Sequence, residues 1–288
     1  MKEDDTQQVR SELLSLIKLL DDDDEAIYGI AKDRLIASGE MTLALITEMY
    51  GHIGDGVLYK RLKEIIEEIT FVQLKEEFKT FKQKYGSALD LEEGAFLIAR
   101  IGMPLFDQKP YVEQLNALAA ELDDRIDHSH DPHDIIQTVN HYFFVDKGFK
   151  GNGSDYYNLD NHFLNRVLDT KTGVPISLST IYILVTRRLN IPVYGIGMPA
   201  HFIVRYTLGN INIYVDPFNE GRILNREDCI EFLRTAGYDF REEYLEPVLS
   251  GQILERMLRN LIVVYDKLKE KKQVEHLLQY IDILNSNA

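Results

Sequence analysis

A histidine and an aspartate stand near the two ends of the stretch "GMPAHFIVRYTLGNINIYVDPF", residues 197–218. Alternating side chains on either side of Leu208-Gly209 predict a β-hairpin with those two residues as its loop, which makes His201 and Asp216 direct cross-strand neighbours. Side chains opposed in this way are close enough for a carboxylate to accept a hydrogen bond from an imidazole. Such a carboxylate orients a histidine that acts as a general base in acyl transfer, although a purely structural histidine–aspartate pair has the same pattern.

This register separates the hairpin into two faces. It places Ile203 opposite Tyr214 and Arg205 opposite Asn212, on the mixed face that also carries the histidine and the aspartate. The other face is apolar or aromatic throughout and comprises Phe202, Val204, Tyr206, Ile211, Ile213 and Val215. A slip of one residue would mix the two sets, so the pattern favours this register.

Two serines could supply a hydroxyl nucleophile for such a histidine. In "TKTGVPISLSTIYILV", residues 170–185, a Gly-Val-Pro turn introduces a helix with Ser177 and Ser179 in its first turn. Backbone N–H groups at a helix start are free to stabilise an oxyanion, and His201 could take the hydroxyl proton. We prefer the alternative that both serines cap or pack the first turn, because serine often bonds to the backbone there.

Asn161 and Asn165 precede this helix. They could orient His201 or bind a ligand carbonyl, or they could cap the turn around "LDNHF". The single cysteine, Cys229, lies in the amphipathic segment "NREDCIEFLRTAGY". There it is expected to be a small core residue and not a nucleophile. One cysteine excludes an intrachain disulfide and suits a reducing compartment, so we expect a cytoplasmic location.

Two kinds of segment must position these side chains. Residues 6–127 show helical spacing of apolar residues, and the acidic run 21–24 suits a helix start better than a calcium site. Beyond a polar linker the pattern changes to a buried helix at 175–189, a strand in "IPVYGIGM" and the hairpin. This order predicts an α+β fold with a central helix on an antiparallel sheet, followed by a C-terminal helical hairpin. The expected divisions are 1–127, 131–248 and 249–288.

Three histidines, His128, His130 and His133, lie close together in "DDRIDHSHDPHD". No matching distant ligand set accompanies them, and exposed loops often carry histidine, so we expect no metal site. No motif for a cofactor appears either, and none is expected.

The overall charge limits the class of partner. The chain has 288 residues and a formal net charge of −15, which opposes encounter with nucleic acid or an anionic membrane surface. The acidic N-terminus does not resemble a secretory signal, and no apolar run is long enough for a membrane helix. A protein or peptide partner is therefore expected, with no prediction of oligomeric state.

A longer pattern resembles a known family. The stretches "YYNLDNHFLNRVLDTKTGVPISLSTIYILVTRRLNIPVYGIGMPAHFIVRY" and "IYVDPFNEGRIL" are similar to the SirB-type family of bacterial transglutaminase-like proteins. The acidic helical region before them and "ILERMLRNLIVVYDKLKEKKQVEHLLQYIDIL" after them also look like that family. The resemblance implies a helical N-terminal segment, a papain-like or transglutaminase-like core and tetratricopeptide-type helices at the end.

One position departs from the pattern of active transglutaminase-like enzymes. In those enzymes a cysteine opens the central helix, followed by a histidine strand and an aspartate strand. By resemblance His201 and Asp216 match the latter two, whereas Pro175 stands at the cysteine position. The resemblance therefore implies a pseudoenzyme, a binding or regulatory module for a peptide or protein. The alternatives are a hydrolase or acyltransferase with a Ser-His-Asp arrangement, and a scaffold whose histidine–aspartate pair is purely structural.

Overall fold

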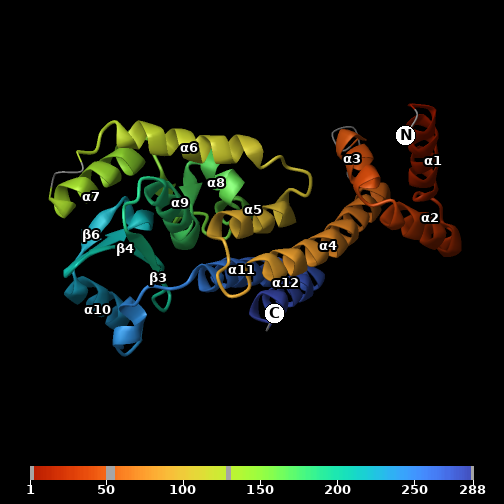
Figure 1. The fold of residues 1–288 in the computed structure, drawn as a ribbon. Coiled ribbons are helices and arrows are strands. Elements are labelled where there is room, and N and C mark those ends of the chain that lie inside the picture. Colours follow the sequence, from red (N-terminus) through yellow and green to blue (C-terminus); the bar gives the residue numbers. More distant parts are fainter. Residues whose placement is uncertain (1–2, 50–55, 128–130, 287–288) are drawn as a thin grey trace. The chain divides into compact units, whose positions relative to one another are not determined.

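A computed structural model describes residues 3–49, 56–127 and 131–286, which form two compact units. The first unit contains the chain up to residue 78 together with 103–106. The second contains residues 79–102 and everything from 107 onward. Both are drawn in Figure 1. The three-part division expected from the sequence remains a prediction.

The first unit is helical. Its elements are α1 (Glu3–Leu19), α2 (Glu25–Ala37), α3 (Glu40–Met49) and most of α4 (Val57–Tyr85). The acidic run 21–24 acts as predicted at a helix start, since the Asp24 carboxylate accepts a hydrogen bond from the backbone N–H of Ala26 at 2.8 Å. Leucine and isoleucine side chains from all four helices form its core, including Ile17, Leu35, Ile46 and Ile65. Burial of this shared apolar face stabilises the unit.

Helices surround a small sheet in the second unit. Its main helices are α5 (Leu91–Gly102), α6 (Lys109–Asp123), α7 (Pro132–Asn140), α8 (Leu164–Thr170), α9 (Pro175–Arg188), α10 (Arg226–Thr235), α11 (Ser250–Lys267) and α12 (Lys271–Asn285). Short helical turns lie at His141–Asp146, Leu159–Asn161, Pro217–Asn219 and Glu242–Leu245. Asp131 caps α7 by accepting a hydrogen bond from the backbone N–H of His133. This is the capping geometry that the aspartate–proline sequence favours.

The sheet is antiparallel with strand order β3-β4-β5-β6. These strands are β3 (Val193–Ile196), β4 (Ile203–Leu208), β5 (Ile211–Asp216) and β6 (Arg222–Leu224). A separate parallel pair joins β1 (Lys150–Gly151) to β2 (Thr172–Gly173). Helix α9 packs against β3 and β4, and α10 lies on the other side of the sheet (Figure 1). Cys229 and Leu233 of α10 cover the mixed face of the sheet. The sheet therefore lies between two helices.

The predicted register of the hairpin is wrong. Its loop is Gly209-Asn210, so Val204 faces Val215 and Arg205 faces Tyr214. Gly209 adopts a φ of 59°, a left-handed conformation that glycine tolerates and that tight hairpin loops require. The partner of Val204 shifts by two positions, from 213 to 215, and an even shift keeps every side chain on its predicted face. The predicted separation of an apolar and a mixed face is therefore retained.

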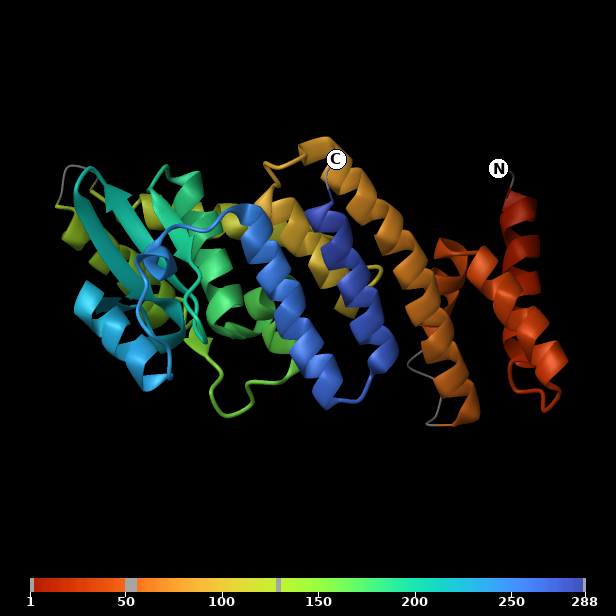
Figure 2. The same ribbon diagram turned by 90° about the horizontal axis from the view of Figure 1, so that it is seen from below.

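The expected α+β class is confirmed. Helix α9 is buried on all sides from Pro175 to Thr186, as its sequence predicts for a central helix. The predicted C-terminal hairpin is present as α11 and α12, which lie side by side (Figure 2). Helix α11 also contacts α5 and α9. In the part of the chain that the structure describes, no helix is long and apolar enough to cross a membrane.

Candidate functional site

His201 and Asp216 form a buried hydrogen-bonded pair. The Nε2 atom of His201 lies 2.7 Å from Oδ2 of Asp216, and the two residues are 8% and 4% exposed. An ionised carboxylate only accepts, so Nε2 carries the proton and Nδ1 of a neutral ring is the acceptor. The predicted pair therefore exists, although the two residues are not directly opposed. His201 precedes the first residue of β4 by two positions, and the even shift in register leaves it on the face of Asp216.

Asp216 has further partners at the end of β5. Its Oδ1 accepts hydrogen bonds from the backbone N–H groups of Phe218 and Asn219 at 3.1 and 3.2 Å, and its Oδ2 accepts one from the Asn219 side chain at 2.7 Å. Burial alone would raise the pKa of Asp216, but the hydrogen bond and charge of His201, with those from Asn219, lower it below its ordinary value. Asp216 is therefore an ionised carboxylate whose orientation is fixed by its hydrogen bonds.

The ring of His201 is also held by aromatic contacts. It packs against Phe232 of α10 with ring centroids 5.1 Å apart, and meets Phe218 edge-on at 6.3 Å. The backbone carbonyl of His201 accepts a hydrogen bond from Arg256 Nη2 at 2.7 Å. The position and orientation of this ring are therefore fixed by the sheet together with α10 and α11.

Both candidate serine hydroxyls bond to the backbone. Ser177 Oγ donates to the carbonyl of Asn161 at 2.7 Å and accepts from the backbone N–H of Val174 at 3.0 Å. Ser179 Oγ lies 3.5 Å from the carbonyl of Phe202. Both serines are fully buried, and neither hydroxyl bonds to His201 in the described structure. Such contacts are expected of serines that cap or pack the first turn of a helix.

Glycine at position 173 permits the close turn before α9. A Cβ atom added there would lie 2.7 Å from Ser177 Oγ, closer than real Cβ contacts allow. Pro175 follows as the first residue of α9, where its missing N–H costs nothing. The Gly-Val-Pro turn predicted from the sequence thus places Pro175, which has neither a hydroxyl nor a thiol, at the first position of the helix.

The two asparagines support the local structure. The side chain of Asn161 donates to the carbonyl of Asp155 at 2.6 Å and accepts from Asn152 at 3.3 Å. Asn165 is fully buried, and its side chain interacts with the hydroxyl of Tyr111 on α6. Neither side chain bonds to His201. The Leu159–Asn161 turn is capped by Asn158, which accepts a hydrogen bond from the backbone N–H of Asp160, and not by Asn161.

Cys229 is a buried core residue of α10, as the sequence indicates. Burial raises the pKa of its thiol to about 12, and the charges of Asp228 and Asp216 act in the same direction. A thiol in this environment forms almost no thiolate at neutral pH, so it is a poor nucleophile.

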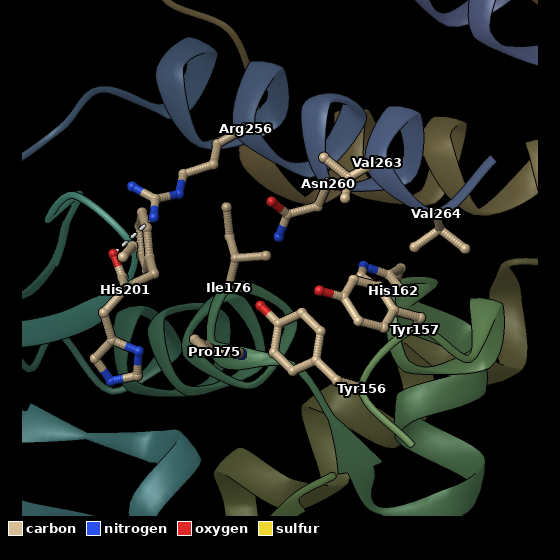
Figure 3. Close-up of a pocket in the computed structure, with 12 residues that line it drawn as sticks. Tyr156, Tyr157, His162, Pro175, Ile176, His201, Arg256, Asn260, Val263 and Val264 are labelled. Atoms are coloured by element: carbon tan, nitrogen blue, oxygen red, sulfur yellow. Dashed lines mark hydrogen bonds between the residues drawn. The ribbon is translucent and has the colours of Figure 1, made fainter. Parts of the chain in front are cut away.

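A cavity of about 200 Å³ lies beside His201. Residues from the 156–162 loop, the start of α9, the 200–202 segment and α11 line it (Figure 3). The lining set is Tyr156, Tyr157, His162, Pro175, Ile176, Ala200, His201, Phe202, Arg256, Asn260, Val263 and Val264. Of the residues proposed from the sequence, Pro175 and His201 line this cavity, whereas the serines and asparagines do not.

Sequence reasoning missed the contribution of α11 to the site. Arg256 and Asn260 are one helical turn apart on an amphipathic helix, whose sequence is interpreted most simply as a packing helix. The sequence indicates this contribution only through two polar residues, four positions apart, that lie beside the buried stripe of Met257 and Leu261. The tyrosines of the 156–162 loop carried no periodic signal at all.

No group of three or more potential metal ligands occurs in the described ranges. His133 lies on α7 and is exposed, while His128 and His130 fall outside the described residues.

The model for the transglutaminase-like superfamily matches residues 109–259, more than half of the chain. The chain belongs to the transglutaminase-like superfamily. A UPF0162 protein of Xylella fastidiosa (strain 9a5c) is 36% identical over 183 residues, which cover 62% of this chain and 65% of that protein. UPF0162 protein PA3419 of Pseudomonas aeruginosa is 29% identical over 178 residues, or 59% and 63% of the two chains.

F-box only protein 21 of Homo sapiens is 32% identical over 136 residues, which cover 44% of this chain and 21% of that protein. The chain thus spans just under two-thirds of the UPF0162 relatives and about a fifth of the F-box protein. No solved structure matches the chain.

Proposed function

We propose that this transglutaminase-like protein is a non-catalytic module that binds a peptide segment beside His201. The observation that carries the proposal is the start of α9. Pro175 and Ile176 face the cavity there, and neither has an O–H or S–H group. A covalent acyl-transfer site needs a nucleophile within hydrogen-bond reach of its base.

The histidine–aspartate pair has a use without a nucleophile. With the Nε2 proton held by Asp216, Nδ1 of a neutral His201 is an acceptor with no hydrogen bond to another described residue. An acceptor on the wall of a cavity can bind a backbone N–H of an extended chain. The pair would then orient a ligand, in the way it would otherwise orient a reacting group.

A serine-based hydrolase or acyltransferase is the alternative. The short, buried bond between His201 and Asp216 favours it, because this is the geometry of a base and its orienting acid. The reaction would require Ser177 to leave the carbonyl of Asn161 and the backbone N–H of Val174. Breaking two buried hydrogen bonds before reaction makes Ser177 an unfavourable nucleophile.

Intact-protein mass spectrometry after incubation with a fluorophosphonate probe separates the two proposals. The binding module is expected to show no adduct, with the wild type matching the Ser177→Ala, Ser179→Ala and His201→Ala variants. An adduct that is lost in His201→Ala and in one serine variant would overturn the binding proposal and establish a serine enzyme.

Four finer assignments belong to this proposal. The quoted motifs support the SirB-type family and a tetratricopeptide-type role for α11 and α12. The acidic net charge supports a protein or peptide partner over nucleic acid or a membrane surface. The lone buried cysteine suits a cytoplasmic location.

A further inference from the structure

Arg256 brings a positive charge to the cavity without an acidic neighbour. The residues that line the cavity include no aspartate or glutamate, although the chain carries 47 of these against 32 lysines and arginines. The guanidinium forms no ion pair within the described structure. Its charge is therefore available to an anionic ligand.

The guanidinium of Arg256 is held in place by hydrogen bonds that do not use all of its N–H donors. Its Nη1 donates to the carbonyl of Met198 at 2.9 Å, and its Nη2 donates to that of His201 at 2.7 Å. These bonds use two of the five N–H donors of an arginine, and they fix the group above the ring of Phe202 at 5.5 Å. Burial lowers the pKa of Arg256, so an anion placed beside it would offset the cost of the buried charge.

His162 presents unpartnered nitrogens on the same cavity. It is 3% exposed, and neither Nδ1 nor Nε2 has a hydrogen-bond partner of normal length and angle, although the backbone of Tyr156 lies close to the ring. Burial lowers its pKa to about 4, only partly offset by the nearby backbone of Tyr156, so the ring is neutral at pH 7. A buried polar group without a partner is unusual and costs free energy. A ligand in the cavity would supply the missing partner.

Three more polar groups point into this space. The side-chain amide of Asn260 and the hydroxyls of Tyr156 and Tyr157 are turned toward the interior of the cavity in Figure 3. None of these groups has a hydrogen bond to another described residue. Each of them can donate a hydrogen bond, so together with Arg256 they favour a ligand rich in acceptors.

The remaining wall is apolar and the space is small. Ile176, Phe202, Val263 and Val264 contribute aliphatic and aromatic surface. The volume of about 200 Å³ is below the range of roughly 300–1,000 Å³ typical of sites for drug-sized ligands. A group of about one amino-acid residue, with an apolar part and an anionic end, suits both the size and the lining.

We infer that this cavity binds a carboxylate-bearing group of about one amino-acid residue, with Arg256 pairing with the carboxylate. The inference rests on the proposed function and names the ligand class of the same site. Two sources share this chemistry, the free C-terminal residue of a peptide and a small carboxylic acid. His162, Asn260 and the two tyrosines would complete the hydrogen bonds around it.

Fluorescence anisotropy with the full chain tests the inference. The probes are fluorescein-labelled tetrapeptides Gly-Gly-Gly-Xaa with a free carboxylate, where the last residue is leucine, phenylalanine or tyrosine. At least one acid is expected to bind, and its C-terminal amide to bind about tenfold to a hundredfold more weakly, because a charge-assisted bond to arginine is lost. Equal binding of acid and amide, or no binding of any acid, would overturn the inference.

Competition distinguishes the two sources. If N-acetylphenylalanine displaces the phenylalanine peptide within about threefold of the unlabelled peptide, the site recognises a single carboxylic acid residue. If it is much weaker, the site recognises a peptide end. Inorganic phosphate that displaces the peptide as well as the acid does would contradict carboxylate recognition.

Arg256→Gln is expected to abolish the preference for acid over amide. Arg259→Gln is the matched control, since Arg259 lies on the same helix, pairs with Glu255 and is exposed. It removes the same charge and should leave the preference unchanged. The comparison of acid with amide on the wild type remains decisive even if Arg256→Gln perturbs the fold. A fluorophosphonate adduct would refute the proposed function alone, because the acid would then be a product that binds at the same place.

Discussion

The two sides of the site differ in how their polar groups are satisfied. On the sheet side, Asp216 accepts four hydrogen bonds and holds Nε2 of His201. On the α11 side, His162 has two unpartnered nitrogens and Arg256 has no anion beside it. The chain completes the first side by itself. We propose that a ligand completes the second side, which makes it the side that identifies the ligand class.

This difference follows from the elements that build each side. The histidine and aspartate come from adjacent strands whose side chains alternate, so their meeting is determined by backbone pairing. The α11 side combines a loop at 156–162 with a helix nearly a hundred residues later in the chain. Tertiary packing alone brings those segments together, and it leaves a cavity between them.

The largest effect on stability is expected when a hydrogen-bonded residue of the sheet side is removed. Asp216→Ala removes the partner of His201 and leaves the N–H groups of Phe218 and Asn219 without an acceptor. Loss of one member of a buried pair costs about 3–5 kcal/mol in the free energy of unfolding. Urea denaturation should show a fall of that size. Asp282→Ala, on an exposed position of α12, should change stability by no more than about 0.5 kcal/mol.

A pH dependence is expected from the unsatisfied side. Burial holds the pKa of His162 at about 4, below its ordinary value of 6.5, so the unfolded chain binds a proton that the folded chain excludes between these values. Stability should therefore fall as pH drops from 6.5 to 4, by roughly 3 kcal/mol in total. Asp216 does not share this window, because its pKa lies below its ordinary value through its bonds to His201 and Asn219, despite burial.

Urea denaturation at pH 7 and pH 4.5 measures this effect. The fall should be much smaller in His162→Leu and unchanged in His133→Leu, since His133 is exposed. An equal fall in the wild type and His162→Leu would show that His162 is not the group responsible.

The smallest effect is expected when the unpartnered histidine is removed at pH 7. His162→Leu removes a buried ring whose nitrogens have no partner, so it should raise stability by about 1 kcal/mol. His201→Leu leaves Asp216 buried without its partner and should lower stability. Stability changes of opposite sign in the two variants would support the contrast between the two sides. A loss of stability in both variants would contradict it.

Parts of this site follow from sequence and parts do not. The meeting of His201 and Asp216 was predicted although the register was wrong, because a shift of two residues preserves which face a side chain occupies. The roles of Cys229 and of the Asp131 cap also follow from local patterns. Each of these depends on interactions within a few residues or between adjacent strands.

The cavity could not be predicted in this way. Arg256 and His162 come from segments with no pattern that links them, and their importance lies in partners that they lack. A missing hydrogen bond has no signature in sequence. The propensity of serine for the first turn of a helix favours capping over catalysis at Ser177. The hydrogen bonds of its hydroxyl to the backbone of Asn161 and Val174 are those of a capping residue.

The mass of a bound peptide shows whether the site binds its ligand without reaction. A tetrapeptide acid that binds by anisotropy is incubated with the protein for a day at saturating protein and then recovered for mass spectrometry. We expect the peptide to be recovered with its mass unchanged and in full amount. A shortened or acyl-transferred peptide, absent when His201→Ala is used, would contradict it and show that the site is catalytic.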